Sequence, residues 1–162
     1  MTVDPAQQAE QAVDQIEEFV RAAGGLAVLS TIDRSGAPHS SLVNAGILPH
    51  PHTGEPVIAL VAIDGGRKLR NLERDPRAVV LFRDGYRWIA AEGEATIVGP
   101  DHPHPDFPPA DLPGLLRDTF RIAGGGEHSD WAEYDRVMAA ERRVLVLIGI
   151  GRTYGNRPRA TS

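Results

Sequence analysis

The sequence predicts a mainly β protein with α-helices, built as a small antiparallel barrel of six strands with peripheral helices. Short apolar runs separated by tight turns fill residues 26–98, and one more apolar run occupies 143–151. Strands joined by hairpins, with a single short helix between the third and fourth, are typical of such a barrel. At 162 residues the chain has the length of one domain, so we expect a single domain over 1–162.

The first expected element is a helix over residues 5–22. Asp4 can cap it, Pro5 suits its first position, and Gly24 supplies its end. The barrel proper is expected over 26–98 together with the last strand, and a helical insertion over 111–141 lies between them. Within these limits the expected strands are 26–32, 37–48, 57–63, 78–83, 86–98 and 143–151, and the expected later helices are 111–121 and 129–141.

Composition excludes several classes of function. The chain has no cysteine, which excludes disulfides, thiolate metal sites and cysteine nucleophiles. Its longest apolar run, Val144–Ile150, is far shorter than the roughly 20 residues that a membrane span needs. The first residues lack the pattern of a secretion signal, so we expect a cytoplasmic protein with no membrane partner. A net charge of −5 and an aromatic content of 6% do not favour nucleic-acid binding.

The most informative motif is the stretch from Ile63 to Pro76, where two glycines precede a short basic helix. Arg67 and Lys68 fall in the first turn of this helix, where the helix dipole favours acidic residues instead. A bound anion would remove the conflict, because backbone N–H groups at a helix start bind phosphate and glycines allow close approach. The alternative is a solvated basic helix start.

These residues resemble a known family. The segments Gly66-Arg-Lys-Leu-Arg-Asn-Leu72, Asp75-Pro-Arg-Ala-Val-Val-Leu-Phe82 and Arg87-Trp-Ile-Ala-Ala-Glu-Gly-Glu-Ala95, with the opening turn Asp33-Arg-Ser-Gly-Ala-Pro38, are similar to the pyridoxamine-phosphate-oxidase-like split-barrel oxidoreductases. The resemblance covers about residues 10–100 and implies a six-stranded split β-barrel. It also implies a homodimer that binds a flavin or deazaflavin cofactor between its subunits and acts on a small-molecule substrate.

The resemblance also implies a phosphate site. Arg67 and Lys68 match the pair that holds the cofactor phosphate in the family, and Asn71 lies one turn further along the helix. Val61 and Ala62 fall where the third strand faces the phosphate. We therefore expect these five residues to contact the phosphate end of the cofactor.

The remaining expected contacts lie on two other strands. Ser41 and Asn44 lie on the second strand, where the family contacts the ring and the ribityl chain. Trp88 lies on the strand that lines the groove from the neighbouring subunit. No residue is marked as a catalytic acid or base, so the catalytic residues stay unknown.

Departures from the family pattern reduce the number of activities that we expect. Val61-Ala62 replaces hydroxyl-bearing residues, Trp88 replaces a glutamine, and the family's C-terminal substrate motif is not recognisable, which argues against a vitamin-interconverting oxidase. The segments Tyr134-Asp-Arg-Val-Met138 and Glu141-Arg-Arg-Val144 look more like the deazaflavin branch, which uses coenzyme F420. We therefore expect hydride transfer from reduced coenzyme F420 to a conjugated or electron-poor acceptor, with FMN as the alternative cofactor.

Two further alternatives stay open, and a third is not expected. The fold also accommodates proteins that bind a cofactor without turnover, and haem-binding relatives, for which His39 is the candidate ligand. The histidine pairs His50/His52 and His102/His104 suggest a metal site, but neighbouring carboxylates show no ligand pattern. We expect no metal.

Overall fold

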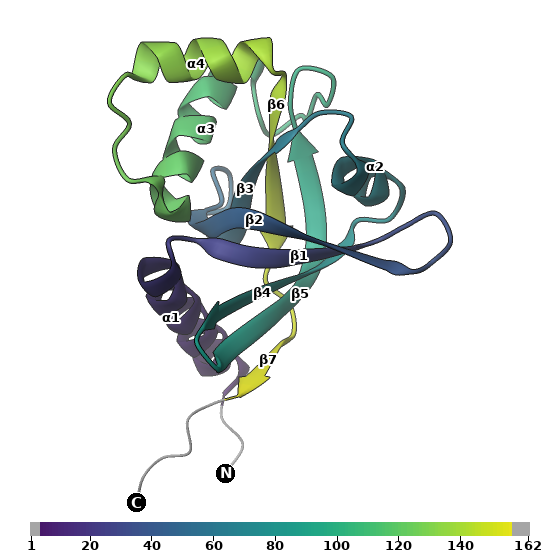
Figure 1. The fold of residues 1–162 in the computed structure, drawn as a ribbon, viewed down its shortest axis with the longest axis vertical. Coiled ribbons are helices and arrows are strands. Elements are labelled where there is room, and N and C mark those ends of the chain that lie inside the picture. Colours follow the sequence, from purple (N-terminus) through teal and green to yellow (C-terminus); the bar gives the residue numbers. More distant parts are fainter. Residues whose placement is uncertain (1–3, 157–162) are drawn as a thin grey trace, which may run out of the picture.

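The computed structural model describes residues 4–156 and shows a barrel with helices around it (Figure 1). Its elements in chain order are α1 (Pro5–Ala23), β1 (Leu26–Ile32), β2 (Pro38–Pro49), β3 (Pro56–Ile63), α2 (Arg67–Arg74), β4 (Arg77–Asp84), β5 (Arg87–Val98), a 3-10 turn (Pro109–Asp111), α3 (Leu112–Phe120), a π-helical turn (Arg121–Gly125), α4 (Trp131–Ala140), β6 (Arg143–Gly149) and β7 (Thr153–Asn156).

Six antiparallel strands close into the barrel, which confirms the predicted split-barrel fold. The strand order β4-β1-β2-β3-β6-β5 is completed by pairing of β5 with β4. The two longest strands each serve two partners: β2 pairs with β1 along 38–44 and with β3 along 45–49. Likewise, β5 pairs with β4 along 87–94 and with β6 along 95–98. The barrel therefore consists of two half-sheets that β2 and β5 join.

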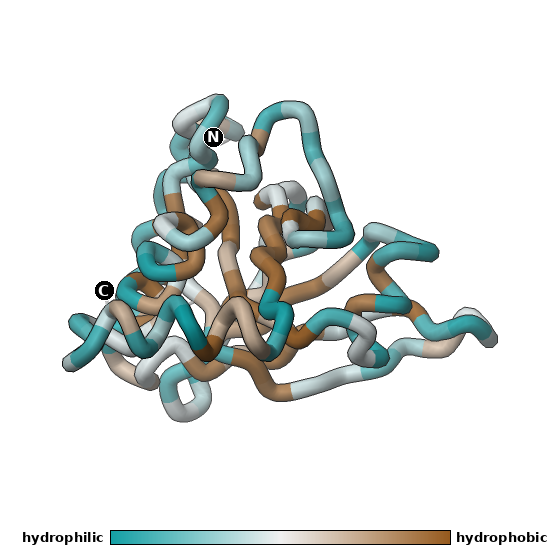
Figure 2. The backbone as a smooth tube through the Cα atoms, turned by 90° about the horizontal axis from the view of Figure 1, so that it is seen from above, coloured by the Kyte–Doolittle hydropathy of each residue, from teal (hydrophilic) through white to brown (hydrophobic). Residues whose placement is uncertain are grey.

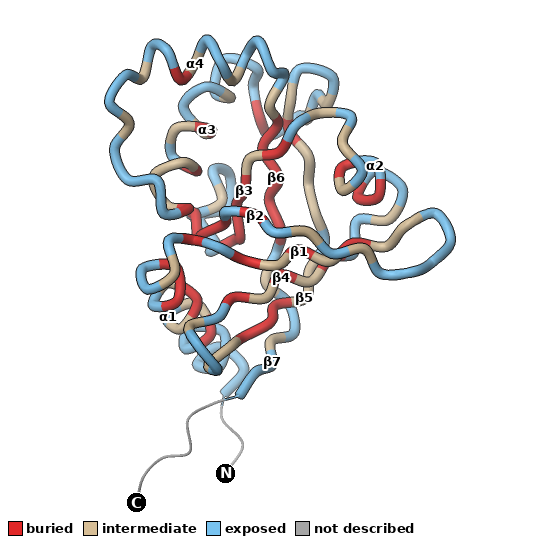
Figure 3. Tube along the Cα trace, viewed as in Figure 1, coloured by how far each residue is buried: buried red, intermediate tan, exposed pale blue. Residues whose placement is uncertain are grey.

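β3 and β6 are buried on both faces, which explains why they read as continuous apolar runs. Ile58 and Val146 face the barrel interior with the apolar face of α1 and the helix α2. Ala59 and Leu147 face outward, under the helical insertion. Burial is correspondingly continuous along these two strands (Figure 3), whereas hydrophilic segments mark the projecting turns and the outer helices (Figure 2). A strand that is covered on both sides has no polar face, so its sequence does not alternate between polar and apolar residues.

α1 forms as the sequence predicts. Asp4 accepts a hydrogen bond from the Ala6 backbone N–H, and Gly24 ends the helix with a φ of +65°. Ile16 and Phe19 on its inner face are almost fully buried against the barrel. The 19-residue helix is thus held by one amphipathic face, as helices in globular proteins usually are.

The helical insertion lies on the outer face of β3 and β6, with α3 and α4 together at one end of the molecule (Figure 1). The π-helical turn that joins them touches the barrel backbone directly. A Cβ atom added to Gly46 of β2 would lie 2.2 Å from the carbonyl oxygen of Ile122, and one added to Gly25 would lie 2.1 Å from that of Ala123. The two glycines therefore let the insertion approach β2 and the chain just before β1 more closely than any side chain would permit.

The C-terminal end differs from the sequence prediction. β6 ends at Gly149 instead of residue 151, and a further strand, β7, pairs with β5 along 88–91. The strand Thr153–Asn156 contains a glycine and exposed polar residues, so it lacks the alternation that marks a strand in a sequence. Its pairing depends on a partner strand that lies more than 60 residues away in the chain.

The helices among residues 4–156 are all too short or too polar to cross a membrane.

Candidate functional site

The start of α2 is an uncapped helix N-terminus that carries two cations. Gly66 stands at the N-cap position with no side-chain hydrogen bond, and the first turn contains no acidic residue. Arg67 and Lys68 occupy this turn, so unpaired backbone N–H groups and two positive side chains share one place. This arrangement suits an anion.

Gly65, the first of the two glycines before α2, is required by the turn that precedes the helix. Gly65 has a φ of +74°, a conformation that side chains rarely adopt, and a Cβ atom added there would meet open space. Asp64 accepts a hydrogen bond from the Gly65 N–H. Turn geometry therefore explains Gly65, and its predicted role in giving a phosphate room stays a prediction.

A large groove opens beside Lys68, between the barrel and the helical insertion. Its volume is about 840 Å³. The barrel side comes from β2 and β3, the far side from α3, the π-helical turn and α4, and Arg143 of β6 adds a second cation. The residues that define this groove are Leu42, Val43, Asn44, Val61, Lys68, Thr119, Phe120, Ala123, Gly124, Gly125, His128, Ser129, Glu133, Tyr134, Val137, Met138 and Arg143.

The far wall of the groove contains an aromatic cluster. Phe120 lies edge-on to Tyr134 with ring centroids 5.2 Å apart, and His128 packs against both of these rings. The Tyr134 hydroxyl donates a hydrogen bond to the backbone oxygen of Leu116, and burial raises its pKa. The apolar residues Leu42 and Val137 are exposed at the groove. Aromatic and aliphatic walls with two cations suit a planar ring attached to an anion.

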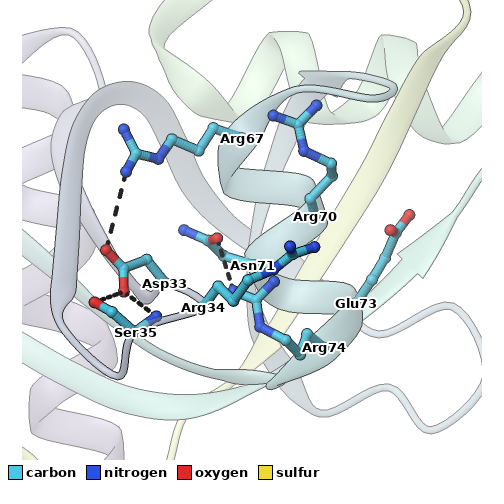
Figure 4. A pocket seen from close by; sticks show the side chains of 8 residues that line it. All are labelled: Asp33, Arg34, Ser35, Arg67, Arg70, Asn71, Glu73 and Arg74. Atoms are coloured by element: carbon cyan, nitrogen blue, oxygen red, sulfur yellow. Dashed lines mark hydrogen bonds and ion pairs between the residues drawn. The ribbon is translucent and has the colours of Figure 1, made fainter.

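A second hollow lies on the other side of Arg67, and all of the residues that line it are charged or polar. This arginine pocket, of about 740 Å³, is formed by α2 and the β1–β2 turn and is lined by Asp33, Arg34, Ser35, Arg67, Arg70, Asn71, Glu73 and Arg74 (Figure 4). Arg67 approaches Asp33, with 3.9 Å between the guanidinium nitrogen and the carboxylate oxygen. Hydrogen bonds from Ser35 hold the pKa of Asp33 below its usual range and fix the turn.

Asn71 is buried, and its side chain makes contacts within the protein. It is 3% exposed, and its amide nitrogen donates to the Thr31 hydroxyl of β1 at 3.0 Å. Its amide oxygen accepts a hydrogen bond from Arg74, also at 3.0 Å (Figure 4). Both ends of the amide are therefore engaged within the protein, so it borders the arginine pocket mainly as the anchor of α2 on β1.

The other expected site residues are divided between the groove and places outside it. Asn44 and Val61 line the groove with Lys68, and the Asn44 amide donates to the Gly24 backbone oxygen. Ser41 lies on β2 with its hydroxyl oxygen buried and without a hydrogen-bond partner among residues 4–156. Ala62 is 3% exposed and faces the barrel interior.

Trp88 lies at the far end of the barrel from α2, outside both hollows. Its backbone N–H donates to the Asn156 side chain, and its ring contacts Tyr154 with centroids 6.0 Å apart. A single chain therefore does not bring Trp88 together with Lys68. Its predicted contact across a subunit boundary stays a prediction.

The histidine-rich loops meet each other around one phenylalanine. The rings of His50 and His104 both pack on Phe107, and the Nδ1 atoms of these two histidines accept backbone hydrogen bonds within their own turns. His102 behaves differently: its Nε2 lies 3.1 Å from an Asp64 oxygen and 3.4 Å from a Glu73 oxygen. The paired histidines thus face different partners and do not converge.

His39, the residue that a haem-binding role would need, also lies outside both hollows. It is half-buried on β2, and its Nδ1 is enclosed by protein without a hydrogen-bond partner in the described part of the chain.

Sequence reasoning missed most of the far wall of the groove. Phe120, His128 and Tyr134 come from elements that were expected only as helices of an insertion. The segment Tyr134–Met138 was used to identify a branch of the family but was assigned no contact. The available signal was its amphipathic spacing, with Tyr134, Val137 and Met138 on one helix face.

Comparisons with known proteins agree with this geometry. The model of the family described as Pyridoxamine 5'-phosphate oxidase matches residues 12–107, which is more than half of the chain. A conserved hypothetical protein of Mycobacterium tuberculosis, Rv2991, is similar at 25% identity and a TM-score of 0.63, with 96% of this chain and 85% of that one covered.

Two further solved structures share the fold. An F420 reductase is similar at 15% identity and a TM-score of 0.56, covering 85% of this chain and 94% of its own. A pyridoxamine 5'-phosphate oxidase-related, FMN binding protein of Nostoc punctiforme is similar at 12% identity and a TM-score of 0.59, covering 98% of this chain and 100% of its own. At these identities the likeness establishes the fold alone.

Proposed function

The chain belongs to the pyridoxamine 5'-phosphate oxidase family and has its flavin-binding oxidoreductase fold, and from this premise we propose that it is an oxidoreductase dependent on coenzyme F420. FMN is the alternative cofactor, because both cofactors carry a phosphate on a ribityl chain. The observation that carries the proposal is the uncapped, cationic start of α2 at the edge of an aromatic groove.

The residues present fit a cofactor of this kind. Lys68 is half-buried at the groove and forms no ion pair among residues 4–156, so its charge is available for a phosphate. The buried Ser41 hydroxyl lacks a partner, and a buried polar group without one is costly. Both features are explained if part of a polar ligand lies along β2 and the start of α2.

The protein's share of the chemistry is binding and orientation. Reduced deazaflavin, when bound, supplies a hydride to an electron-poor acceptor. Lys68 and the α2 backbone N–H groups would hold the phosphate, and Asn44 and Val61 would border the ribityl chain and the ring. The apolar and aromatic far wall would exclude water and present a flat surface to a conjugated acceptor.

A homodimer is part of the proposal. The groove is open on one side, and exposed apolar residues, among them Leu42 and Val137, border it. A second subunit would cover this side and could bring its own Trp88 to the cofactor, as the family resemblance implies. We propose that this dimer acts in the cytoplasm.

The test is a fluorescence titration of cofactor-stripped protein with coenzyme F420 and with FMN at matched salt. We expect saturable binding of coenzyme F420 that is tighter than binding of FMN. Oxidation of the reduced cofactor by a panel of conjugated acceptors, followed by absorbance, then tests turnover.

The outcomes separate the alternatives. Tighter binding of FMN would move the protein to the flavin-dependent branch, and tight binding without oxidation by any acceptor would support a cofactor-binding protein that is not an enzyme. Binding of neither cofactor would contradict the proposal.

A further inference from the structure

Three side chains of the kinds that bind metal ions converge beside α2 from separate parts of the chain. Asp64 lies in the turn that follows β3, Glu73 lies near the end of α2, and His102 lies in the turn after β5. One ligand atom of each residue, a carboxylate oxygen or a ring nitrogen, lies within 4.8 Å of the other two. Neither carboxylate is near His102 in the sequence, so the spacing of the histidines could not indicate this group.

One ring nitrogen faces two carboxylates in this cluster. The Nε2 atom of His102 lies 3.1 Å from an Asp64 oxygen and 3.4 Å from a Glu73 oxygen. A ring nitrogen carries at most one hydrogen, and the hydrogen bond goes to Asp64. The Glu73 carboxylate accepts no hydrogen bond within residues 4–156. Arg142, a further cation near Asp64, pairs with Asp101. Even a protonated imidazole therefore leaves the three side chains with a net negative charge.

The distances in the cluster are close to those between ligand atoms around one ion. Bonds of about 2.0–2.2 Å in a tetrahedral Zn²⁺ site place neighbouring ligand atoms roughly 3.3–3.6 Å apart. The two distances at the His102 nitrogen, 3.1 Å and 3.4 Å, are close to this range. The Glu73 side chain is 43% exposed and extends away from Asp33 (Figure 4), so it can adjust to complete the third edge.

The fold holds the other two ligands in place. Asp64 accepts a hydrogen bond from the Gly65 N–H at 2.9 Å. The backbone N–H of His102 donates to the Gly99 oxygen at 3.0 Å, and a Cβ atom added to Gly99 would lie 2.5 Å from a methyl carbon of Val144, so this turn packs closely on β6. The side chains of His102 and Asp64 are only 18% and 17% exposed. An ion would thus meet ligands that are already largely ordered.

We propose that Asp64, Glu73 and His102 bind one divalent transition-metal ion, such as Zn²⁺. Imidazole combined with carboxylates suits these ions, whereas Mg²⁺ and Ca²⁺ prefer oxygen ligands alone. The charge of the ion would balance both carboxylates, which a single ring N–H cannot do. Three protein ligands leave a further position for water. Without the ion, the hydrogen bond between His102 and Asp64 holds the cluster together.

The ion would connect three segments that meet at α2, namely the turn before the helix, the helix itself and the turn after β5. Asp64 and His102 line neither the groove nor the arginine pocket, so the site is separate from the one proposed for the cofactor. Its expected role is to stabilise the folded state, because an ion that binds only this state raises its stability by mass action. The inference does not depend on the proposed function.

The experiment titrates protein that has been treated with a chelator, in the absence of cofactor, with Zn²⁺ by calorimetry. A weak competing chelator in the buffer suppresses binding at isolated surface histidines. We expect one site per chain and a midpoint of thermal unfolding that rises with the Zn²⁺ concentration. Mg²⁺ at the same concentrations should leave this midpoint almost unchanged.

Glu73→Gln is the most informative variant, because the carboxylate that it removes accepts no hydrogen bond within residues 4–156. Its metal-free stability should nearly match the wild type, and its affinity for Zn²⁺ should fall at least about tenfold. His102→Gln should lose at least as much affinity, although it also breaks the contact with Asp64. The matched control is His52→Gln: His52 lies 4.0 Å from Asp106, and no third ligand joins this pair in the described part of the chain. This control should bind Zn²⁺ as the wild type does.

Failure of the wild type to bind Zn²⁺ at one site per chain would overturn the inference. Unaltered Zn²⁺ affinity of Glu73→Gln or of His102→Gln would also overturn it. The same holds if His52→Gln lost as much affinity as these variants, because the ion would then lie on surface histidines. None of these outcomes affects the proposed function, since no cofactor is present in the experiment.

Discussion

The two hollows beside α2 share one border and differ in everything else. The groove has aromatic and aliphatic walls from five elements and two cations at its edge. The arginine pocket is formed by one turn and one helix and is lined by charged and polar side chains. The first is suited to a ring that must be kept from water, and the second to anions that stay solvated. Arg67 and Lys68, adjacent residues of one helix, thus line two hollows of different chemical character.

The groove should be the more fragile of the two, because its far wall depends on close backbone contact. Replacing Gly46 with alanine places a Cβ atom 2.2 Å from the Ile122 oxygen, so the π-helical turn must move away from β2. We expect a loss of about 3 kcal/mol in the free energy of unfolding, together with weaker ring binding. Urea denaturation and cofactor titration measure the two effects.

Gly149→Ala is the matched control, since a Cβ atom added there meets nothing within 4 Å. Its stability should change by no more than about 0.5 kcal/mol. If Gly46→Ala were as stable as this control, the close contact between the π-helical turn and Gly46 of β2 would be contradicted.

Removing the cation at the edge of the groove should affect binding without affecting the fold. Lys68→Ala removes a charge-assisted contact to the phosphate, which we expect to weaken cofactor binding by about 1–3 kcal/mol. Lys68→Arg should keep most of the affinity. If Lys68→Ala bound the cofactor as tightly as the wild type, the proposal that the phosphate lies at the start of α2 would be contradicted.

Asn71 tests whether α2 binds the ligand through this side chain or is merely anchored by it. Asn71→Ala leaves the Thr31 hydroxyl and an Arg74 donor without their partner, so we expect a loss of about 1–2 kcal/mol in unfolding free energy. Affinity for the cofactor should stay the same. Thr31→Val breaks the same contact from the other side, and the double variant should cost less than the two changes added together. If Asn71→Ala instead lowered the affinity for the cofactor and left the free energy of unfolding unchanged, the predicted contact between Asn71 and the phosphate would be supported.

The contrast between Lys68 and Asn71 shows what the sequence could predict. The apolar runs of β3 and β6 and the basic helix start are local patterns. The first predicted the barrel, which the structure confirms, and the second predicted a phosphate site at the start of α2, which stays a prediction. The position of Asn71, one turn after Lys68, is one that a ligand-binding residue could also occupy. Only its contact with Thr31 in the structure shows that its side chain is buried. Local patterns therefore placed the helix but could not show which of its side chains turn inward.

The far wall and the arginine pocket could not be predicted for a related reason. Phe120 and Tyr134 reach the groove because Gly46 admits the insertion, and these positions lie over 70 residues apart. Arg34 meets Arg70 and Arg74 because a hairpin turn lies beside α2 (Figure 1). β7 depends likewise on a distant partner strand. Each of these features is set by tertiary contacts, which leave little trace in local spacing.

The smallest predicted effect concerns the loop that carries the glycines before α2, next to both hollows. The hydrogen bond from His102 holds the pKa of Asp64 below its ordinary value of 3.8. A carboxyl whose pKa is lowered in the folded state stabilises the fold at pH values above its unfolded pKa, and this contribution is lost as pH falls through the folded pKa. Asp64→Asn should therefore cost about 1 kcal/mol near neutral pH, and the difference from wild type should shrink as pH falls below 3.8 and vanish once the pH lies below the lowered pKa of the folded state.

A second Asp–His contact provides the comparison for this pH dependence. Asp106 lies 4.0 Å from His52, and both side chains are largely exposed, so Asp106→Asn should leave the unfolding free energy almost unchanged across the same pH range. Denaturant unfolding at several pH values measures both variants. If Asp64→Asn showed a constant difference down to acid pH, the carboxylate charge would not be what stabilises the loop.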